Sequence, residues 1–402
     1  MIVVETFKGK SVAEHSVEIV ERKGRGHPDY ICDSIMDAIS VALSGEYTKK
    51  FGTILHHNID KGLLVAGRTM KQFGGGRLLK PMELIIGDRA TIGIGRRKIP
   101  VRDIAVNTAK KWFRENLRFV DPERDVKYRV VLAKGSEELT DIFLRPGEIR
   151  GANDTSAAVG YYPLSPTETV VLKLEGYLNS KEFKKRFPET GEDVKVMGMR
   201  RERDLDITIA MPLLSRYISS ESEYFHRKKL IHEEMMTFLD SFKQLTFRDI
   251  IVHYNTLDVE GRGLGGVYLS LLGTSAEDAD SGQVGRGNRV NGLISMNRPM
   301  STEAASGKNP VSHVGKIYNI LTHRIAREIY EASEGMKEVY VLLLSRIGTP
   351  IDRPQMATAQ ILLERREKIK DVAENAERII ERALQNINNF CLELAEGKYP
   401  VC

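Results

Sequence analysis

The sequence GTSAEDADSGQVGRGNRVNGLISMNRPMSTEAASGKNPVSHVGKIY, residues 273–318, is the stretch around which the rest of the chain is organised. It holds seven glycines, four carboxylates, three arginines and two lysines, and it has few large apolar residues. A segment of this composition cannot form a buried strand or helix along its whole length. We therefore expect a long functional loop, or a series of turns, beside a pocket.

The charged residues of this stretch suit a metal ion and a polyphosphate. Glu277, Asp278 and Asp280 form an acidic cluster of hard oxygen ligands, which suit a divalent cation. Arg286 and Arg289 follow, and a glycine stands on each side of Arg286. Guanidinium groups bind phosphate oxygens in pairs, and glycine lets backbone N–H groups approach closely.

Lys308 completes this pattern. It precedes Asn309-Pro310, a good helix N-cap and first helical position, and apolar residues at helical spacing follow over residues 311–329. We expect Lys308 at a helix N-terminus, where amide donors and the helix dipole favour anions. The stretch predicts a metal–polyphosphate site. The alternative is a charged surface loop, which has no need of so many glycines.

Residues 20–44 show the same pattern of cations and glycines before a helix start. Lysine and arginine alternate with glycine over residues 22–26 and lead into His27-Pro28-Asp29, and apolar residues at helical spacing follow over residues 31–43. Because Pro28 suits the first helical position, His27 and Asp29 should bracket a helix N-terminus. The alternative for His27 is an N-cap with no further function.

Three other polar corners add candidate residues. Asp60 follows His56-His57 in a corner between two short predicted strands, and adjacent histidines point to opposite faces of a strand, so they make a poor metal pair. Asp154 lies in the small-residue corner 151–156. Lys134, Gly135, Ser136 and Glu137 follow a predicted strand and offer backbone N–H groups to a phosphate, although a plain turn fits them equally well.

The order of predicted elements favours an α+β fold. Paired strands mix with helices, and neither a dinucleotide-binding glycine fingerprint nor a Walker lysine loop follows a strand. The predicted strands are 2–6, 130–133, 250–255, 266–272 and 339–344, with a hairpin over 191–198 and 205–211; the predicted helices are 101–120, one from Ser165 onward, 221–242 and a long terminal helix over 364–394.

Length, composition and cysteine use bound the class of protein. The 402 residues allow two or three domains or one interleaved unit, and 41% hydrophobic with 29% charged residues is typical of a soluble globular protein. A net charge of +5 does not call for nucleic acid. Three scattered cysteines, no signal peptide and no membrane-length apolar run predict a cytoplasmic protein. Abundant Glu, Lys and Arg with scarce Gln favour a thermophilic source.

Five longer motifs occur in the order found in S-adenosylmethionine synthetases, and the chain resembles the archaeal branch of that family over nearly its whole length. The motifs are ERKGRGHPDYICD (21–33), FGTILHHNID (51–60), ANDTS (152–156), GTSAEDADSGQVGRGNRVNGLI (273–294) and EAASGKNPVSHVGKIYN (303–319).

The resemblance implies a methionine adenosyltransferase: methionine sulfur attacks C5′ of ATP, and the triphosphate leaves and is cleaved to pyrophosphate and phosphate. It implies Mg²⁺, in many members a monovalent cation, and a homodimer with active sites between the subunits. It also implies one catalytic unit over residues 1–402, built from three interleaved α+β subdomains about a pseudo-threefold axis.

The resemblance also implies roles for single residues. His27 resembles a histidine beside the ribose–triphosphate bridge, Asp29 and Asp280 resemble magnesium ligands, and Arg286 and Lys308 resemble triphosphate-binding cations. The remaining matches are Asp154 near methionine and adenosine, Lys195 as a further family lysine, and Lys134–Glu137 as the nucleotide loop, in which Ala133 stands where a glycine is common.

The chain departs from the bacterial pattern at two places. Where a second lysine follows the glycine-lysine motif, this chain has Ser312 and His313 and then Lys316, so that His313 or Lys316 shares the work of Lys308. The bacterial carboxylates near the monovalent cation have no clear counterpart over residues 57–68, which leaves that cation open.

Two other classes of function compete with this interpretation. A phosphotransferase could use the same metal–polyphosphate site and would leave ADP. A non-catalytic nucleotide or nucleic-acid binder would spread basic residues over a surface with aromatic residues between them, whereas only 7% of this chain is aromatic.

Overall fold

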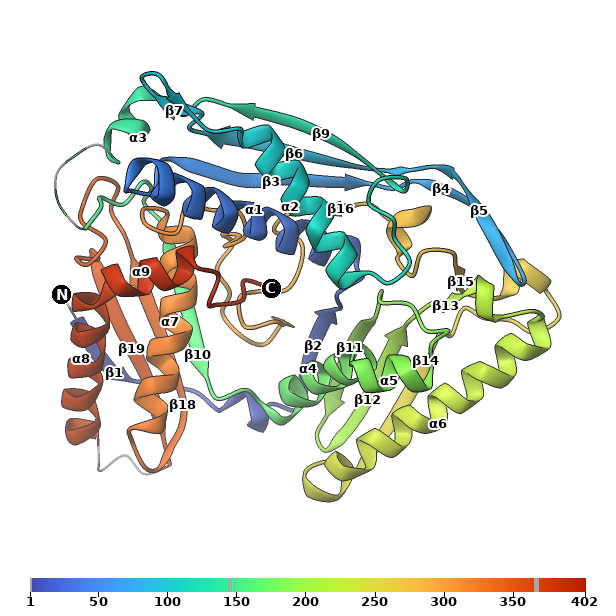
Figure 1. Ribbon diagram of the computed structural model, residues 1–402. Coiled ribbons are helices and arrows are strands. Elements are labelled where there is room, and N and C mark those ends of the chain that lie inside the picture. Colours follow the sequence, from blue (N-terminus) through green and yellow to red (C-terminus); the bar gives the residue numbers. More distant parts are fainter. Residues whose placement is uncertain (1, 144, 146, 148, 365–368) are drawn as a thin grey trace.

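The computed structural model describes residues 2–143, 145, 147, 149–364 and 369–402. They form three larger mixed sheets with helices packed against them, so the predicted α+β class is confirmed. In Figure 1 three sheet-and-helix units surround a centre that holds the C-terminal tail. None of the described helices is long and apolar enough to cross a membrane.

One order of elements recurs in the three units: helix, strand, strand, helix, strand. The two middle strands pair antiparallel, and the last strand pairs parallel with the second of them. The first unit consists of α1 (Pro28–Phe51), β3 (His57–Val65), β6 (Met82–Ala90), α2 (Val101–Asn116) and β9 (Val126–Ala133). The second consists of α4 (Pro166–Leu178), β11 (Lys195–Arg201), β12 (Asp204–Ala210), α6 (Glu221–Leu245) and β14 (Asp249–Tyr254). The third consists of α7 (Val314–Glu331), β18 (Met336–Leu344), β19 (Met356–Leu363) and α8 (Ile369–Gln385), and the N-terminal β1 (Ile2–Thr6) takes its last place.

Each unit also receives a strand from outside its own segment. Strand β2 (Val17–Lys23), which precedes α1, pairs with β11 of the second unit. Strand β10 (Ala157–Tyr162), which precedes α4, pairs with β18 of the third unit. Strand β16 (Gly282–Gln283), which lies in the segment before α7, pairs with β3 of the first unit. The units are therefore interleaved in a cycle, and segments far apart in sequence meet at each junction.

Helix α1 has an apolar face and a carboxylate-bearing face. Ile31, Ile35 and Ile39 are fully buried in the core of the first unit, together with Leu64 of β3 and Ile86 of β6. Spacings of four residues place these isoleucines on one side of the helix. Another side carries Asp29, Asp33 and Asp37, at the same spacing, toward the segment that begins at β16.

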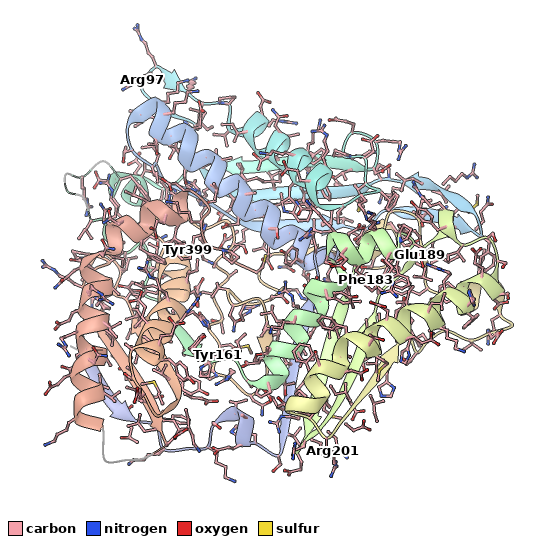
Figure 2. All side chains as sticks on the ribbon, turned by 60° about the horizontal axis from the view of Figure 1, so that its bottom comes forward. Arg97, Tyr161, Phe183, Glu189, Arg201 and Tyr399 are labelled. Carbon is pink, nitrogen blue, oxygen red and sulfur yellow. The ribbon has the colours of Figure 1, made fainter. Side chains whose placement is uncertain are left out.

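A buried ionic network joins the second and third units. Arg298, whose side chain is fully buried, contacts Glu168 of α4 at 3.0 Å and Glu338 of β18 at 3.2 Å. Tyr161 of β10 donates to Glu168 Oε1 (2.9 Å) and lies near the middle of the molecule in Figure 2. Loss of one partner in such a network would leave a buried charge uncompensated.

The predicted start of the helix after Lys308 is wrong. Helix α7 begins at Val314, and His313 is its N-cap, with Nδ1 accepting from the Gly315 N–H (3.2 Å). The Asn309 side-chain amide instead donates to Leu55 O (3.0 Å), while its Oδ1 accepts from Val311 N (3.0 Å). These bonds make Asn309-Pro310 a turn, so Lys308 lies before the helix rather than at its N-terminus.

Other element boundaries also differ from the predictions. Residues 57–60 of the predicted corner are part of the continuous strand β3, which has an irregularity opposite Asp88. Only β15 (Leu269–Ser270) forms within 266–272. The terminal helix over 364–394 consists of α8 and α9 (Ile387–Ala395), and residues 365–368 lie outside the described part. Sequence periodicity did not identify β6 and β19, because the apolar residues of each strand cluster in a short run (84–86 and 361–363) that periodicity cannot tell from a helical segment.

The other predicted elements are confirmed within a few residues. They are β1, α1 with His27 as its N-cap and Pro28 as its first residue, α2, β9, α4, the β11–β12 hairpin, α6, β14 and β18.

Candidate active site

A first group of predicted site residues forms where β2 runs into α1. The ammonium group of Lys23 lies 2.9 Å from Asp29 Oδ2 and donates to the backbone carbonyl of Arg286 (2.7 Å). His27 lies beside Asp29, and its Nδ1 accepts a hydrogen bond from the Asp29 backbone N–H (3.2 Å). Lys195 of β11 is the register partner of Lys23, so it joins this group from the second unit.

Arg286 is the exposed cation of the first group. Its guanidinium makes no ion pair or hydrogen bond with any residue in the described part of the chain, whereas Lys195 lies 3.3 Å from Glu21 Oε1. A free guanidinium beside glycines can accept an anion without first releasing a carboxylate.

His27 is neutral at neutral pH. Burial lowers its pKa to about 4; Asp29 opposes the shift, and Lys23, Lys195 and Arg286 add to it. The imidazole therefore adds no positive charge to the group, and its ring nitrogens remain available for hydrogen bonding.

The two predicted magnesium ligands flank the same turn. Asp29 Oδ1 accepts a hydrogen bond from Gln283 N (2.9 Å). Asp280, three residues before Gln283, is exposed, and its Oδ1 accepts from Ser281 N (2.9 Å). Among the described residues no three His, Cys, Asp or Glu side chains gather to hold a metal ion. This donor set suits a cation that keeps water and phosphate ligands, as Mg²⁺ does, rather than a protein cage.

A second group surrounds Lys308. Its ammonium is nearly buried and lies 3.0 Å from Asp60 Oδ2 and 2.8 Å from Glu303 Oε2. The charge of Lys308 is therefore already balanced by two carboxylates, unlike that of Arg286. His313 is buried close by, and burial and the charge of Lys308 lower its pKa to about 3.

The carboxyl groups of Asp60 and Asp88 lie on either side of Asn58 within the second group. Asn58 Nδ2 bridges Asp60 Oδ1 and Asp88 Oδ2, at 3.1 Å from each. Burial raises the pKa of Asp88 to about 6, and the neighbouring Asp60 adds to that rise. Burial opposes ionisation of Asp60 as well, but its hydrogen bond with Asp88 and the charge of Lys308 lower its pKa. Asp88 has φ 97°, so its backbone is strained beside this group.

Asp154 borders the second group. The backbone N–H of Asn153 donates to Ser312 O (3.2 Å), which places the 151–156 corner against the start of α7. The carboxylate of Asp154 has no hydrogen bond or ion pair with the residues that the structure describes.

Residues 134–137 lie beside a hollow of about 710 Å³. Lys134, Gly135 and Glu137 line it together with residues between 91 and 98, and its size is in the range of small-molecule sites. The Arg89 guanidinium donates to Lys134 O (2.8 Å), so the loop lies next to Asp88 and hence to the second group.

Sequence reasoning missed four carboxylates. Asp33 and Asp37 lie at steps of four from Asp29, a spacing visible in the sequence, whereas Asp88 has no motif around it and Glu303 stands out only as part of the polar stretch. Of the acidic cluster, Glu277 is buried and accepts from Leu272 N (2.6 Å), and Asp278 pairs with Lys71 (2.9 Å), so both support the local backbone.

Comparison with known proteins gives a consistent result. The family model of S-adenosylmethionine synthetase (AdoMet synthetase) matches residues 1–398. The S-adenosylmethionine synthase of Methanocaldococcus jannaschii is 45% identical over 404 residues, covering 99% of this chain and 98% of that protein. That of Pyrococcus furiosus is 43% identical over 402 residues, covering 100% and 99%. In structure, an unusual S-adenosylmethionine synthetase from Campylobacter jejuni matches with a TM-score of 0.61 at 16% identity, covering 95% of this chain and 94% of that one, a likeness of fold.

Proposed function

This chain belongs to the S-adenosylmethionine synthetase family, and from that premise we propose how its residues divide the work of the reaction. The chain is a methionine adenosyltransferase, which forms S-adenosylmethionine from ATP and L-methionine and releases pyrophosphate and phosphate. A thioether sulfur has no proton to lose, so the attack needs no general base. The demand falls on the leaving triphosphate, and catalysis is then alignment together with stabilisation of its charge.

Arg286 is the main cation for the triphosphate. The observation that supports this role is its exposed guanidinium, unpaired among the described residues, between two glycines and close to His27 and Lys195. Neutral His27 donates a hydrogen bond at the ribose–triphosphate bridge. Lys308 takes part only after it exchanges one carboxylate for a phosphate oxygen, and Glu303, whose side chain is 31% exposed, is the partner that can leave.

The divalent metal in this proposal is Mg²⁺, and Asp29 and Asp280 are the residues that would hold it. When bound it neutralises charge on the triphosphate. To hold the metal, Asp29 would give up its contact with the Lys23 ammonium, while its bond to Gln283 N could remain. We assign no residues to a monovalent cation, because residues 57–68 offer no clear counterpart of the bacterial carboxylates.

The substrates occupy the second group and the hollow beside it. Methionine carries an ammonium group, which suits the carboxylates of Asp60 and Asp154, and His313 borders the same place. ATP lies along residues 134–137, over the hollow of about 710 Å³.

The active sites form between two copies of the chain. Asp29 and Asp37, which mark the first and second groups, stand about 12 Å apart along α1 at 1.5 Å per residue. Neither group alone supplies all the contacts that the two substrates need. The sheet faces opposite the helices offer surface for a second copy, because Ile19 of β2, Val131 of β9 and Ile251 of β14 are 37%, 50% and 49% exposed.

The three units are related subdomains about a pseudo-threefold axis and form one catalytic unit over residues 1–402. The recurring element order and the cyclic exchange of β2, β10 and β16 support this arrangement. The unpaired cysteines, of which Cys32 and Cys391 are buried, support a reducing cytoplasm.

An assay of the purified chain with ATP, methionine and Mg²⁺ tests the function. Chromatography should detect the sulfonium product, and phosphorus NMR should follow one pyrophosphate and one phosphate per product, at room temperature and at elevated temperature. Omission of methionine is the control. ADP as the main nucleotide product would favour a phosphotransferase, and nucleotide binding without turnover would favour a sensor.

A further inference from the structure

Three carboxylates of α1 stand at steps of four residues and each accepts a backbone N–H from the segment 283–307. Asp29 accepts from Gln283 N (2.9 Å), Asp33 from Gly285 N (2.9 Å) and Asp37 from Gly307 N (3.3 Å). Residues four apart on a helix lie above one another on one face. Helix α1 therefore binds this segment at three successive points along its length.

Asp33 fixes the backbone on both sides of Arg286. Besides the bond to Gly285 N, its Oδ2 lies so close to Gly287 that a Cβ at that position would overlap it. The Lys23 ammonium also donates to the Arg286 carbonyl (2.7 Å). The backbone of this free guanidinium is thus clamped, although its side chain touches none of the clamping groups.

Asp37 acts in the same way on Lys308. It accepts from Gly307 N and pairs with the Lys316 ammonium (2.5 Å), which in turn donates to Lys308 O (3.2 Å). Lys316 is 1% exposed, so the Asp37–Lys316 pair is inside the protein rather than on its surface.

These contacts are poor choices for stability alone. Asp33 is 2% exposed, and its Oδ2 has no hydrogen-bond partner among the described residues. A buried carboxylate with an unmet oxygen costs free energy, and apolar residues of similar size commonly serve a core better. A polar side chain at this buried position is explained if the position of the loop matters more than the stability of the helix.

We propose that Asp33 and Asp37 are positioning residues, which set the backbone of Arg286 and Lys308 for the leaving triphosphate. The proposal rests on the triphosphate-binding role given above to those two cations. Asp33 acts through Arg286, and Asp37 acts through Lys308 with the help of Lys316.

A double-mutant cycle tests this assignment. Asp33→Ala, Arg286→Leu and the double variant are compared in kcat, in the KM for methionine and in the affinity for inorganic tripolyphosphate measured by calorimetry. We expect each single variant to lower kcat by about 100-fold, as loss of one preorganised donor does. The double variant should lose little more than Arg286→Leu alone, because coupled residues are not additive.

Two comparisons separate a positioning role from a structural one. Asp33→Asn keeps an acceptor for Gly285 N and should recover most of kcat and of the tripolyphosphate affinity. Asp33→Ala combined with Lys308→Met should be additive within about twofold, because Asp33 does not hold Lys308. For Asp37, the double variant Asp37→Asn/Lys316→Met removes both partners of the buried pair, and its loss of kcat should not add to that of Lys308→Met.

The possible results point to different conclusions. Unchanged kcat and tripolyphosphate affinity in Arg286→Leu would remove the proposed role of Arg286 itself. A normal loss in Arg286→Leu, combined with full additivity of Asp33→Ala, would overturn the positioning role alone. The positioning role would also be overturned if Asp33→Asn is as impaired as Asp33→Ala in a protein that melts at the wild-type temperature.

Discussion

At the scale of single residues, this chain uses cations in two different states. Arg286 is exposed and unpaired in the described part, whereas Lys308 is buried between Asp60 and Glu303. Fixed donors aimed at a developing charge act without reorganisation, so Arg286 is the better-placed group. In the proposed reaction, Lys308 must first exchange one of its two carboxylate partners for a phosphate oxygen.

The carboxylates beside Arg286 give a prediction on metal dependence. Asp29→Asn and Asp280→Asn should each cut turnover at least tenfold at low Mg²⁺ and shift half-saturation to higher Mg²⁺, because each removes the charge of one proposed metal ligand. Initial rates over a Mg²⁺ series measure this. Asp278→Asn is the matched control, since Asp278 pairs with Lys71 (2.9 Å). If the Mg²⁺ curves of both variants coincide with the wild-type curve, the ligands lie elsewhere.

The sequence predicted which charged residues belong to the candidate site better than it predicted which residues they contact. His27, Asp29 and Arg286 were predicted from glycines and a helix start, and the structure brings them together. Ion pairs across units, such as Lys308 with Asp60, depend on strand register over some 250 residues and leave no local pattern. For that reason the two-carboxylate environment of Lys308 could not be read from its motif.

At the scale of elements, α1 connects the core to the site. One face is packed in the first unit, and the acidic face holds the segment that begins at β16. Its N-terminal turn was predictable from His27-Pro28, which are the N-cap and first residue. The start of α7 was not predictable, because the side chain of Asn309 is engaged by Leu55, a residue of another unit.

The contact between α1 and β16 gives a prediction with an internal control. Gly282 lies so close to the Pro28 carbonyl that a Cβ would overlap it, whereas Gly45 in the exposed part of the same helix has open space around it. Gly282→Ala should push the loop off α1 and lower kcat at least tenfold, since small misplacements of catalytic groups cost about 100-fold.

Gly45→Ala is the control for that change. It should leave kcat unchanged and stabilise the protein by about 0.5–1 kcal/mol, because alanine loses less backbone entropy in a helix. Thermal melts and steady-state rates on both variants give the comparison. Normal kinetics in Gly282→Ala would show that the loop tolerates displacement and that its contact with α1 is not needed for catalysis.

At the scale of the whole molecule, interleaving explains how one chain makes two separated charged groups. Each unit receives a strand from outside, so cations of β2 and β11 meet at one junction, and Asp60 of β3 meets Lys308 of the segment before α7 at another. The order of predicted elements was enough to predict the α+β class. The cyclic exchange of strands could not be predicted, because the sequence of a strand does not determine which sheet the strand joins.

The division into two groups leads to a test of the proposed dimer. Arg286→Leu breaks the first group and Lys308→Met breaks the second. With two different affinity tags, a heterodimer of one variant chain of each kind is isolated and compared with each variant homodimer and with a doubly tagged wild-type dimer.

If every active site takes one group from each chain, the heterodimer has one intact site and one doubly broken site. By the symmetry of a two-chain assembly its activity should then be about half that of the wild type. If each chain carries a complete site, the heterodimer contains no intact site, and its rate would stay at the mean of the two inactive homodimers. Sedimentation at the assay concentration establishes that the tagged species is a dimer while its activity is measured.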